Sequence, residues 1–115
     1  MDGVLVVFAS TDSADDGCIG FLIARLVLDE AEILTIVSAP EFRRLGIARD
    51  LLEHLIAELR CRDCKNLFLE VASANVAARQ LYEAHDFQIV GKRLGYYPRA
   101  VGSSDDALIM RRELF

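Results

Sequence analysis

The chain has 115 residues, of which 53% are apolar and 27% charged, with 7 Gly and 2 Pro. This length suits a single domain over residues 1–115, and the composition excludes the disordered, collagen-like and low-complexity classes. Because 13 basic and 18 acidic residues give a formal net charge of −5, nucleic acid is not an expected partner, and any anionic ligand must be held by local geometry.

The N-terminal part is expected to form three strands. Val4 to Ser10 is rich in β-branched residues and is followed by a polar turn at residues 11–17. Cys18 to Leu28 is a long apolar run that ends at an acidic pair, and Ile33 to Val37 is a third run. Runs of this kind separated by turns predict a three-stranded meander.

The hydrophobic period then changes to that of an amphipathic helix, which ends near residues 60–65. Leu67 to Val71 follows as a short apolar strand. A strand, a helix and a strand in this order predict a βαβ unit with parallel strands. The helical face consists of Ile47, Leu51, Leu52, Leu55, Ile56 and Leu59.

A second helix is expected from Asn75, which can serve as its N-cap, to about Asp86, which tolerates the left-handed closing position. Its expected buried face is Val76, Ala77, Leu81 and Tyr82. Two β-prone runs then predict a closing antiparallel pair, joined by residues 96–99 and a Gly/Ser/Asp loop. These runs are Phe87 to Gly95 and Ala107 to Leu114.

This order predicts an α/β architecture of mixed type, with about six strands and two main helices. No stretch approaches the roughly 20 apolar residues that span a bilayer, and the apolar run Val4 to Ala9 is too short for a signal-peptide core. The three cysteines are an odd number, which does not suit a secreted disulfide framework. We therefore expect a cytoplasmic protein without a membrane anchor.

A basic turn, Arg-Arg-Leu-Gly-Ile-Ala at residues 43–48, precedes the first helix. The free N–H groups and positive dipole end of a helix N-terminus attract anions, and the small Gly46 and Ala48 would let a phosphate approach the backbone. The turn matches neither the nucleoside-triphosphate loop nor the dinucleotide fingerprint. The alternative is a basic turn that only caps the helix.

Glu70 and Tyr82 are the other candidates for chemistry. Glu70 places a carboxylate in an otherwise apolar strand, and Tyr82 follows twelve residues later on the second helix. Both could face one cleft at the carboxyl ends of the parallel strands, where such sheets commonly bind ligands. The alternatives are an exposed strand face for Glu70 and a core aromatic for Tyr82.

Taken together, these residues resemble the GNAT family of N-acetyltransferases. The resemblance is carried by the turn at 43–48, by Leu69-Glu70-Val71 and by the run from Asn75 to Phe87. Within that superfamily, Gly95-Tyr96-Tyr97-Pro98 followed by residues 105–110 is similar to the bacterial ribosomal-protein-alanine N-acetyltransferases. The resemblance covers about residues 4–114 and implies the GNAT acyl-CoA N-acyltransferase fold.

The resemblance implies acetyl-CoA as the cosubstrate and requires no metal. The pyrophosphate would lie on the backbone of the turn before the first helix, the pantetheine arm would run along the third strand, and Asn75 would also contact coenzyme A. The implied binding residues are Ile36, Val37, Ser38, Arg43, Arg44, Leu45, Gly46, Ile47, Ala48 and Asn75.

The resemblance also implies direct acetyl transfer to a primary amine through a tetrahedral intermediate. Glu70 would take a proton from the amine, usually through water, and Tyr82 would protonate the departing thiolate. Tyr96 and Tyr97 would hold the acceptor, although packing of the hairpin is an equal alternative. The implied acceptor is the α-amino group of a protein or peptide, with a ribosomal protein as one candidate.

The chain departs from the family pattern at its start, where a strand and two helices usually precede the position of Val4. Since those helices help to select the acceptor, a small-molecule amine or a lysine side chain stays open as the acceptor. A non-catalytic acyl-CoA-binding or interaction module is the alternative from another class. A reading frame that begins upstream is also open.

Two further features follow from the sequence. Val4 to Phe8 would be an apolar edge strand, which predicts a homodimer through that edge. Cys61 and Cys64 match half of a zinc site, but no second pair exists and neither His54 nor His85 has a matching spacing. The cysteine pair is therefore interpreted as incidental.

Overall fold

The computed structural model describes residues 3–10, 18–38, 46–98 and 104–115. Within these residues the chain forms six strands and two helices in the predicted order. The elements are β1 (Gly3–Ser10), β2 (Cys18–Val27), β3 (Glu30–Ser38), α1 (Ile47–Cys61), β4 (Asn66–Ala72), α2 (Val76–Ala84), β5 (Gln88–Pro98) and β6 (Ser104–Glu113).

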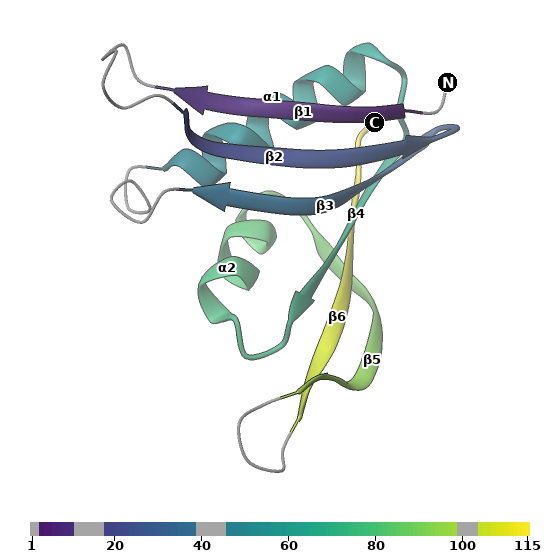
Figure 1. Cartoon of the computed structure of the whole chain (residues 1–115). Coiled ribbons are helices and arrows are strands. Elements are labelled where there is room, and N and C mark those ends of the chain that lie inside the picture. The colour runs from purple at the N-terminus through teal and green to yellow at the C-terminus, as the bar shows by residue number, and fades with distance from the viewer. Residues whose placement is uncertain (1–2, 11–17, 39–45, 99–103) are drawn as a thin grey trace.

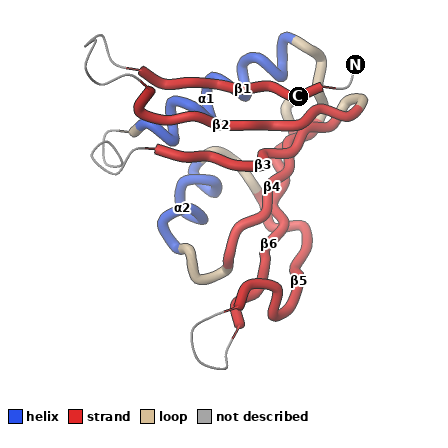
Figure 2. The backbone as a smooth tube through the Cα atoms, in the orientation of Figure 1, coloured by secondary structure: helices blue, strands red, loops and turns tan. Residues whose placement is uncertain are grey.

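The strands form one mixed sheet in the order β1-β2-β3-β4-β6-β5. β1, β2 and β3 form the predicted antiparallel meander, and β4, β6 and β5 form a second antiparallel group. Among the described strands, β3 and β4 are the one parallel pair, as the predicted βαβ unit requires. Figures 1 and 2 show α1 running along one face of the meander.

The parallel contact between β3 and β4 is short. It comprises three residue pairs, Glu30↔Asn66, Ala31↔Leu67 and Glu32↔Phe68. Beyond them β3 stays paired with β2 as far as Ser38, and β4 stays paired with β6 as far as Ala72, so the two strands run apart (Figure 1). Within the described strands, residues 33–38 and 69–72 therefore have no partner strand on the edges that face each other.

The core lies between α1 and the sheet. Every residue of the predicted helical face is buried, from Ile47 to Leu59. These side chains share one core cluster with buried residues of β2, β3, β4 and β6. Burial of an apolar stripe against a sheet is what stabilises a helix of this length. The side chains that are fully buried include Leu22, Leu51, Leu52, Leu55, Leu59, Leu67, Met110 and Leu114.

The predicted face of α2 was wrong in its first turn. Val76 is 55% exposed and Ala77 is exposed as well, whereas Ala78 and Leu81 pack against the core and Tyr82 is buried. The buried stripe is thus rotated by one residue relative to the prediction. A helix of nine residues has few apolar positions. Its contacts with the rest of the fold, and not its own periodicity, therefore decide which side of α2 faces the core.

Both ends of α2 are as predicted. The Asn75 side chain accepts a hydrogen bond from the Ala78 N–H at 3.2 Å, which satisfies one free donor of the first turn. Asp86 adopts the left-handed conformation, with φ of 66°. The Phe87 N–H donates to the Tyr82 carbonyl at 3.1 Å and closes the helix.

Three strands, β3, β5 and β6, extend three residues beyond one of their predicted bounds. β3 begins at Glu30, because residues 30–32 pair with both β2 and β4. β5 extends to Pro98 and β6 begins at Ser104, so residues 96–98, which were expected in the connection, belong to a strand. In each case pairing with a neighbouring strand orders residues whose own sequence favours a turn.

The cysteines of the described chain form no ligand cluster. Cys61 is exposed and Cys64 is buried, and both are free thiols. The Cys64 thiol donates to the Asp29 carbonyl at 3.3 Å, and burial raises the pKa of that thiol. No group of three His, Cys, Asp or Glu converges in the described part of the chain. No helix there combines the length and apolarity that a membrane crossing needs.

Gly20 brings the start of α1 against the end of β3. A Cβ at this position would lie 2.8 Å from Ile47 Cγ2 and 2.8 Å from the Val37 carbonyl oxygen. Only glycine lets the three elements approach so closely. The first turn of α1 is therefore held beside the unpaired part of β3.

We expect Gly20→Ala to lower the free energy of unfolding by about 1 to 3 kcal/mol, because the added methyl group must displace packed backbone. Gly3→Ala is the matched control, since a Cβ there meets nothing within 4 Å, and it should stay within about 0.5 kcal/mol of the wild type. Urea unfolding followed by circular dichroism measures both. Equal stability of the two variants would contradict the close approach at Gly20.

Candidate active site

The turn before α1 is only partly within the described residues. Arg43, Arg44 and Leu45 lie outside them, so the structure begins at Gly46. Gly46 is the N-cap, with φ of 75°, a left-handed conformation in which a side chain would be strained. Its carbonyl accepts the first bond of the helix, from the Asp50 N–H at 3.0 Å.

The N–H groups at positions 47, 48 and 49 precede Asp50, the first residue whose N–H donates within the helix, and so have no intrahelical partner. They point away from the N-terminus of a helix of 15 residues, where the helix dipole favours a negative charge. The Ile47 side chain does not take part in this surface, because it is 8% exposed and packs on Gly20. Ile47 can therefore offer an anion only its N–H.

The predicted residues of the third strand lie on the unpaired part of β3. Leu22 pairs with Ile36 and Gly20 pairs with Ser38, so this segment is held by β2 on one side. The opposite edge has no partner among the described strands. Alternate N–H and C=O groups of a strand point to each side, so this edge presents backbone groups that no described strand pairs with, beside the first turn of α1.

Glu70 projects from β4 to the face opposite the core. Its neighbours Leu69 and Val71 are buried on the core face, and the Glu70 side chain is 26% exposed. Glu70 Oε1 lies 3.1 Å from Arg93 Nη2 of β5. The expected alternative of an exposed strand face is thus only half right, since the carboxylate is half-buried and ion-paired.

Glu70 lines a cavity of about 370 Å³. A second ion pair, Arg25 Nη2 to Glu32 Oε2 at 2.9 Å, also lines it. The cavity joins apolar walls to several charges, which suits a small polar ligand held by one end. Its lining consists of Arg25, Val27, Glu30, Ala31, Glu32, Phe68, Leu69, Glu70, Arg93 and Ile109.

Tyr82 lies on the other side of β4. It is 6% exposed, belongs to the core cluster and packs edge to face on Phe87, with ring centroids 5.7 Å apart. Burial raises the pKa of Tyr82 above its ordinary value of 10.0, because the charged phenolate is poorly solvated there. The phenol is therefore a neutral donor throughout the physiological range.

The sequence suggested that Glu70 and Tyr82 could face one cleft, and in the structure the two residues lie on opposite faces of β4. Glu70 points to the cavity, whereas Tyr82 is in the core with Leu69 and Val71. Between these two faces lies the edge of β4 that faces β3. That edge is the one left without a partner beyond Phe68.

The remaining predicted residues are placed as follows. Asn75 is exposed at the start of α2, where its side-chain oxygen already caps the helix. The backbone of Tyr96 and Tyr97 belongs to β5, and their side chains lie outside the described residues.

Arg93 was not singled out from the sequence. Only the register of β5 on β6 and of β6 on β4 shows that it reaches Glu70.

Comparisons with known proteins agree on one family. The model of the acetyltransferase (GNAT) family matches residues 2–87. A ribosomal protein bS18-alanine N-acetyltransferase of Salmonella typhimurium is 47% identical over 98 residues, which are 85% of this chain and 66% of that protein. Its counterpart in Escherichia coli is 46% identical over 90 residues, 78% of this chain and 60% of that protein.

Solved structures confirm the expected fold. The crystal structure of the Escherichia coli ribosomal-protein-S18-alanine N-acetyltransferase superposes with a TM-score of 0.89 at 37% identity, covering 96% of this chain and 69% of that one. A Bacillus anthracis acetyltransferase in complex with acetyl coenzyme A has a TM-score of 0.82 at 22% identity, covering 96% and 62%. This chain spans about two thirds or less of the length of the two curated relatives.

The raised pKa of Tyr82 predicts how stability depends on alkaline pH. Because the folded state favours the neutral phenol, its contribution is fully present below about pH 10 and is lost as the pH rises through the raised folded value. The free energy of unfolding of the wild type should therefore fall above pH 10 more steeply than that of Tyr82→Phe. Denaturant unfolding at stepped pH measures this, and parallel curves would contradict the burial of the phenol.

Proposed function

The chain belongs to the acetyltransferase (GNAT) family, and we propose that it transfers an acetyl group from acetyl-CoA to a primary amine. The observation that carries the proposal is the separation of β3 from β4 directly beside the N-terminus of α1. An extended ligand with a negatively charged end fits this arrangement. Acetyl-CoA has both parts, a pantetheine arm with amide groups and a pyrophosphate.

The described residues fit this cosubstrate. The unpaired edge at Ile36, Val37 and Ser38 offers backbone groups that could hydrogen-bond to the pantetheine amides, in the way that a peptide adds to a sheet edge. The N–H groups after Gly46 could bind the pyrophosphate, with Arg43, Arg44 and Leu45 completing the turn. The Asn75 amide nitrogen could donate to coenzyme A, since its oxygen caps α2.

Glu70 and Tyr82 would supply the two proton transfers. The amine must lose one proton as its nitrogen bonds to the acetyl carbon, and Glu70, directly or through water, takes it. The carbon–sulfur bond then breaks, and Tyr82 gives its proton to the sulfur. The burial that keeps Tyr82 neutral suits an acid, and the two residues would act from opposite faces of β4.

The acceptor that we propose is the α-amino group of a protein or peptide, and a ribosomal protein is the leading candidate. The names of the relatives support this class. The cavity beside Glu70 carries three glutamates and two arginines, which suits a cationic amine, and Tyr96 and Tyr97 would line its approach. We place the reaction in the cytoplasm, in keeping with free thiols at Cys61 and Cys64.

Glu70→Gln is expected to lower kcat by about 10² to 10⁴-fold, because the amide cannot accept the proton. Acetyl-CoA affinity should stay within about twofold, since Glu70 projects to the opposite side of the sheet from the core. Thiol release measures turnover with a peptide that carries a free N-terminal alanine, and calorimetry measures acetyl-CoA binding. Glu58→Gln is the matched control, an exposed glutamate paired with Arg62 at 2.9 Å.

The same assay separates the competing functions. Acetyl-CoA binding without thiol release for any amine would favour the non-catalytic acyl-CoA-binding module. Thiol release with a lysine side chain or a small amine, but not with an N-terminal α-amino group, would contradict the proposed acceptor class. The proposed acetyl transfer to a primary amine would still stand. Full activity of Glu70→Gln would contradict the proposed base.

We also propose that two copies of the chain associate through β1. This strand is at the edge of the sheet, and its Val4 and Val6 are 62% and 46% exposed. An apolar edge with unpaired backbone groups pairs readily with another strand.

Val6→Lys should therefore shift the protein toward the monomer, because a charged side chain opposes pairing at a strand edge. Sedimentation velocity over a concentration series measures the shift. Leu34→Lys is the control, an apolar residue of β3 with 47% exposure that lies away from that edge. A wild type that is monomeric at every concentration would contradict the proposal.

A further inference from the structure

α2 is held by few apolar contacts. It has nine residues, and Tyr82 is the one that is buried in it. Isolated helices shorter than about 12 to 15 residues are marginal in water, so the position of α2 must depend on contacts at its ends. The N-terminal end is capped by Asn75, which belongs to the same segment, and the Ser73 N–H just before it donates to the Asp106 carbonyl of β6 at 2.9 Å.

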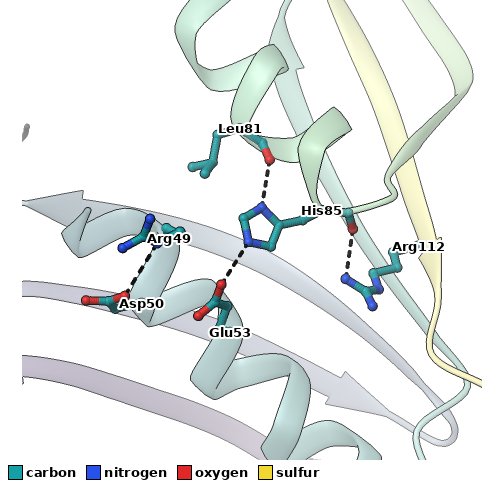
Figure 3. Close-up of polar contacts among 6 residues, drawn as sticks. All are labelled: Arg49, Asp50, Glu53, Leu81, His85 and Arg112. Atoms are coloured by element: carbon teal, nitrogen blue, oxygen red, sulfur yellow. Dashed lines mark hydrogen bonds and ion pairs between the residues drawn. The ribbon is translucent and has the colours of Figure 1, made fainter. Parts of the chain in front are cut away.

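The C-terminal end of α2 is tied to two other elements through His85 (Figure 3). The His85 Nε2 atom lies 3.4 Å from Glu53 Oε1 on α1, and Nδ1 lies 2.9 Å from the Leu81 carbonyl oxygen. The His85 carbonyl accepts a hydrogen bond from Arg112 Nη1 of β6 at 2.8 Å. His85 thus joins α1, α2 and β6, and its side chain is 14% exposed.

The partners of the imidazole ring are both acceptors. A carbonyl oxygen and a carboxylate oxygen can only receive hydrogen bonds, so the ring nitrogen is the donor wherever such a bond forms. Other charged side chains near His85, on α1 and α2, have ion-pair partners of their own. Arg49, one turn before Glu53, pairs with Asp50 at 3.6 Å, and Glu83 on α2 pairs with Arg79 at 3.9 Å.

His85 is also bonded to the turn that carries Tyr82. The His85 N–H donates to the Tyr82 carbonyl at 3.0 Å, and the Phe87 N–H donates to the same oxygen at 3.1 Å. Phe87 in turn packs on the Tyr82 ring. Any displacement of His85 is therefore transmitted to the backbone of Tyr82.

We propose that His85, paired with Glu53, is a positioning residue that fixes the turn of α2 that carries Tyr82. The expected effect on turnover rests on the proposed function. The anchoring of α2 by His85 and Glu53 does not depend on it. α1 is packed on the sheet by six buried residues, so it is a rigid support to which the end of a weakly packed helix can be tied. His85 does not contact the reacting atoms.

The test uses the full chain with His85→Ala and Glu53→Ala, singly and together. Each single variant should lower kcat about tenfold or more, because a displacement of about 1 Å in a reacting group can cost 10²-fold. The KM for acetyl-CoA should stay within about twofold. The double variant should be no slower than either single variant, since the two residues act as one pair.

Two variants serve as references. His85→Gln keeps an N–H donor that can reach Glu53, so it should restore most of kcat, whereas a general loss of packing would not be rescued. His54→Ala is the matched control, because His54 is the other histidine, is exposed and lies next to Glu53 on α1. It should leave kcat and stability unchanged.

Amide hydrogen exchange gives a readout that is independent of catalysis. Exchange at residues 76–85 should be about tenfold faster in His85→Ala and Glu53→Ala, and unchanged in His54→Ala. If His85→Ala fails to fold, α2 exchange and kcat are compared between Glu53→Ala, His85→Gln and the wild type. If the wild type acetylates no amine, the proposed function fails while the exchange result still decides the anchoring.

The proposal is overturned if exchange in α2 is unchanged in both alanine variants. It is also overturned if kcat falls without any change in α2 exchange, since His85 would then act by another route. Equal losses in kcat and in acetyl-CoA affinity would assign His85 a structural role in the whole fold and would likewise contradict it.

Discussion

The three-residue contact between β3 and β4 is the constraint on which the rest of the structure depends. Parallel strands need a crossover connection, here made by α1, and the crossover holds the two strands together at one end only. Beyond the contact, β3 stays paired with β2 and β4 stays paired with β6. The two strands therefore separate while each remains part of a paired sheet. Exposed backbone groups at such an opening need a partner, either water or an extended ligand.

The remaining parts of the site are arranged around this opening. Gly20 holds the first turn of α1 beside the end of β3, which places a helix N-terminus next to a free strand edge. Glu70 and Tyr82 approach from opposite faces of β4. In the proposed reaction these groups would act where β3 and β4 separate, at the carboxyl ends of the two parallel strands.

Local features of this protein could be predicted from its sequence. The periodicity of α1, the capping by Asn75 and the left-handed Asp86 each depend on a few neighbouring residues, and each is confirmed. Features that depend on docking or on register could not be predicted. The rotated face of α2, the short pairing of β3 with β4 and the reach of Arg93 to Glu70 arise from contacts between distant segments.

The most direct test of the account is a titration of the isotope-labelled chain with acetyl-CoA, observed through its backbone amide resonances. We expect the amide resonances of residues 33–38 in β3 and 46–49 at the start of α1 to shift together and to saturate. Coenzyme A without the acetyl group should shift the same two segments. Absence of binding, or shifts confined to other parts of the sheet such as β1, would contradict the central claim that the opening between β3 and β4 binds acetyl-CoA.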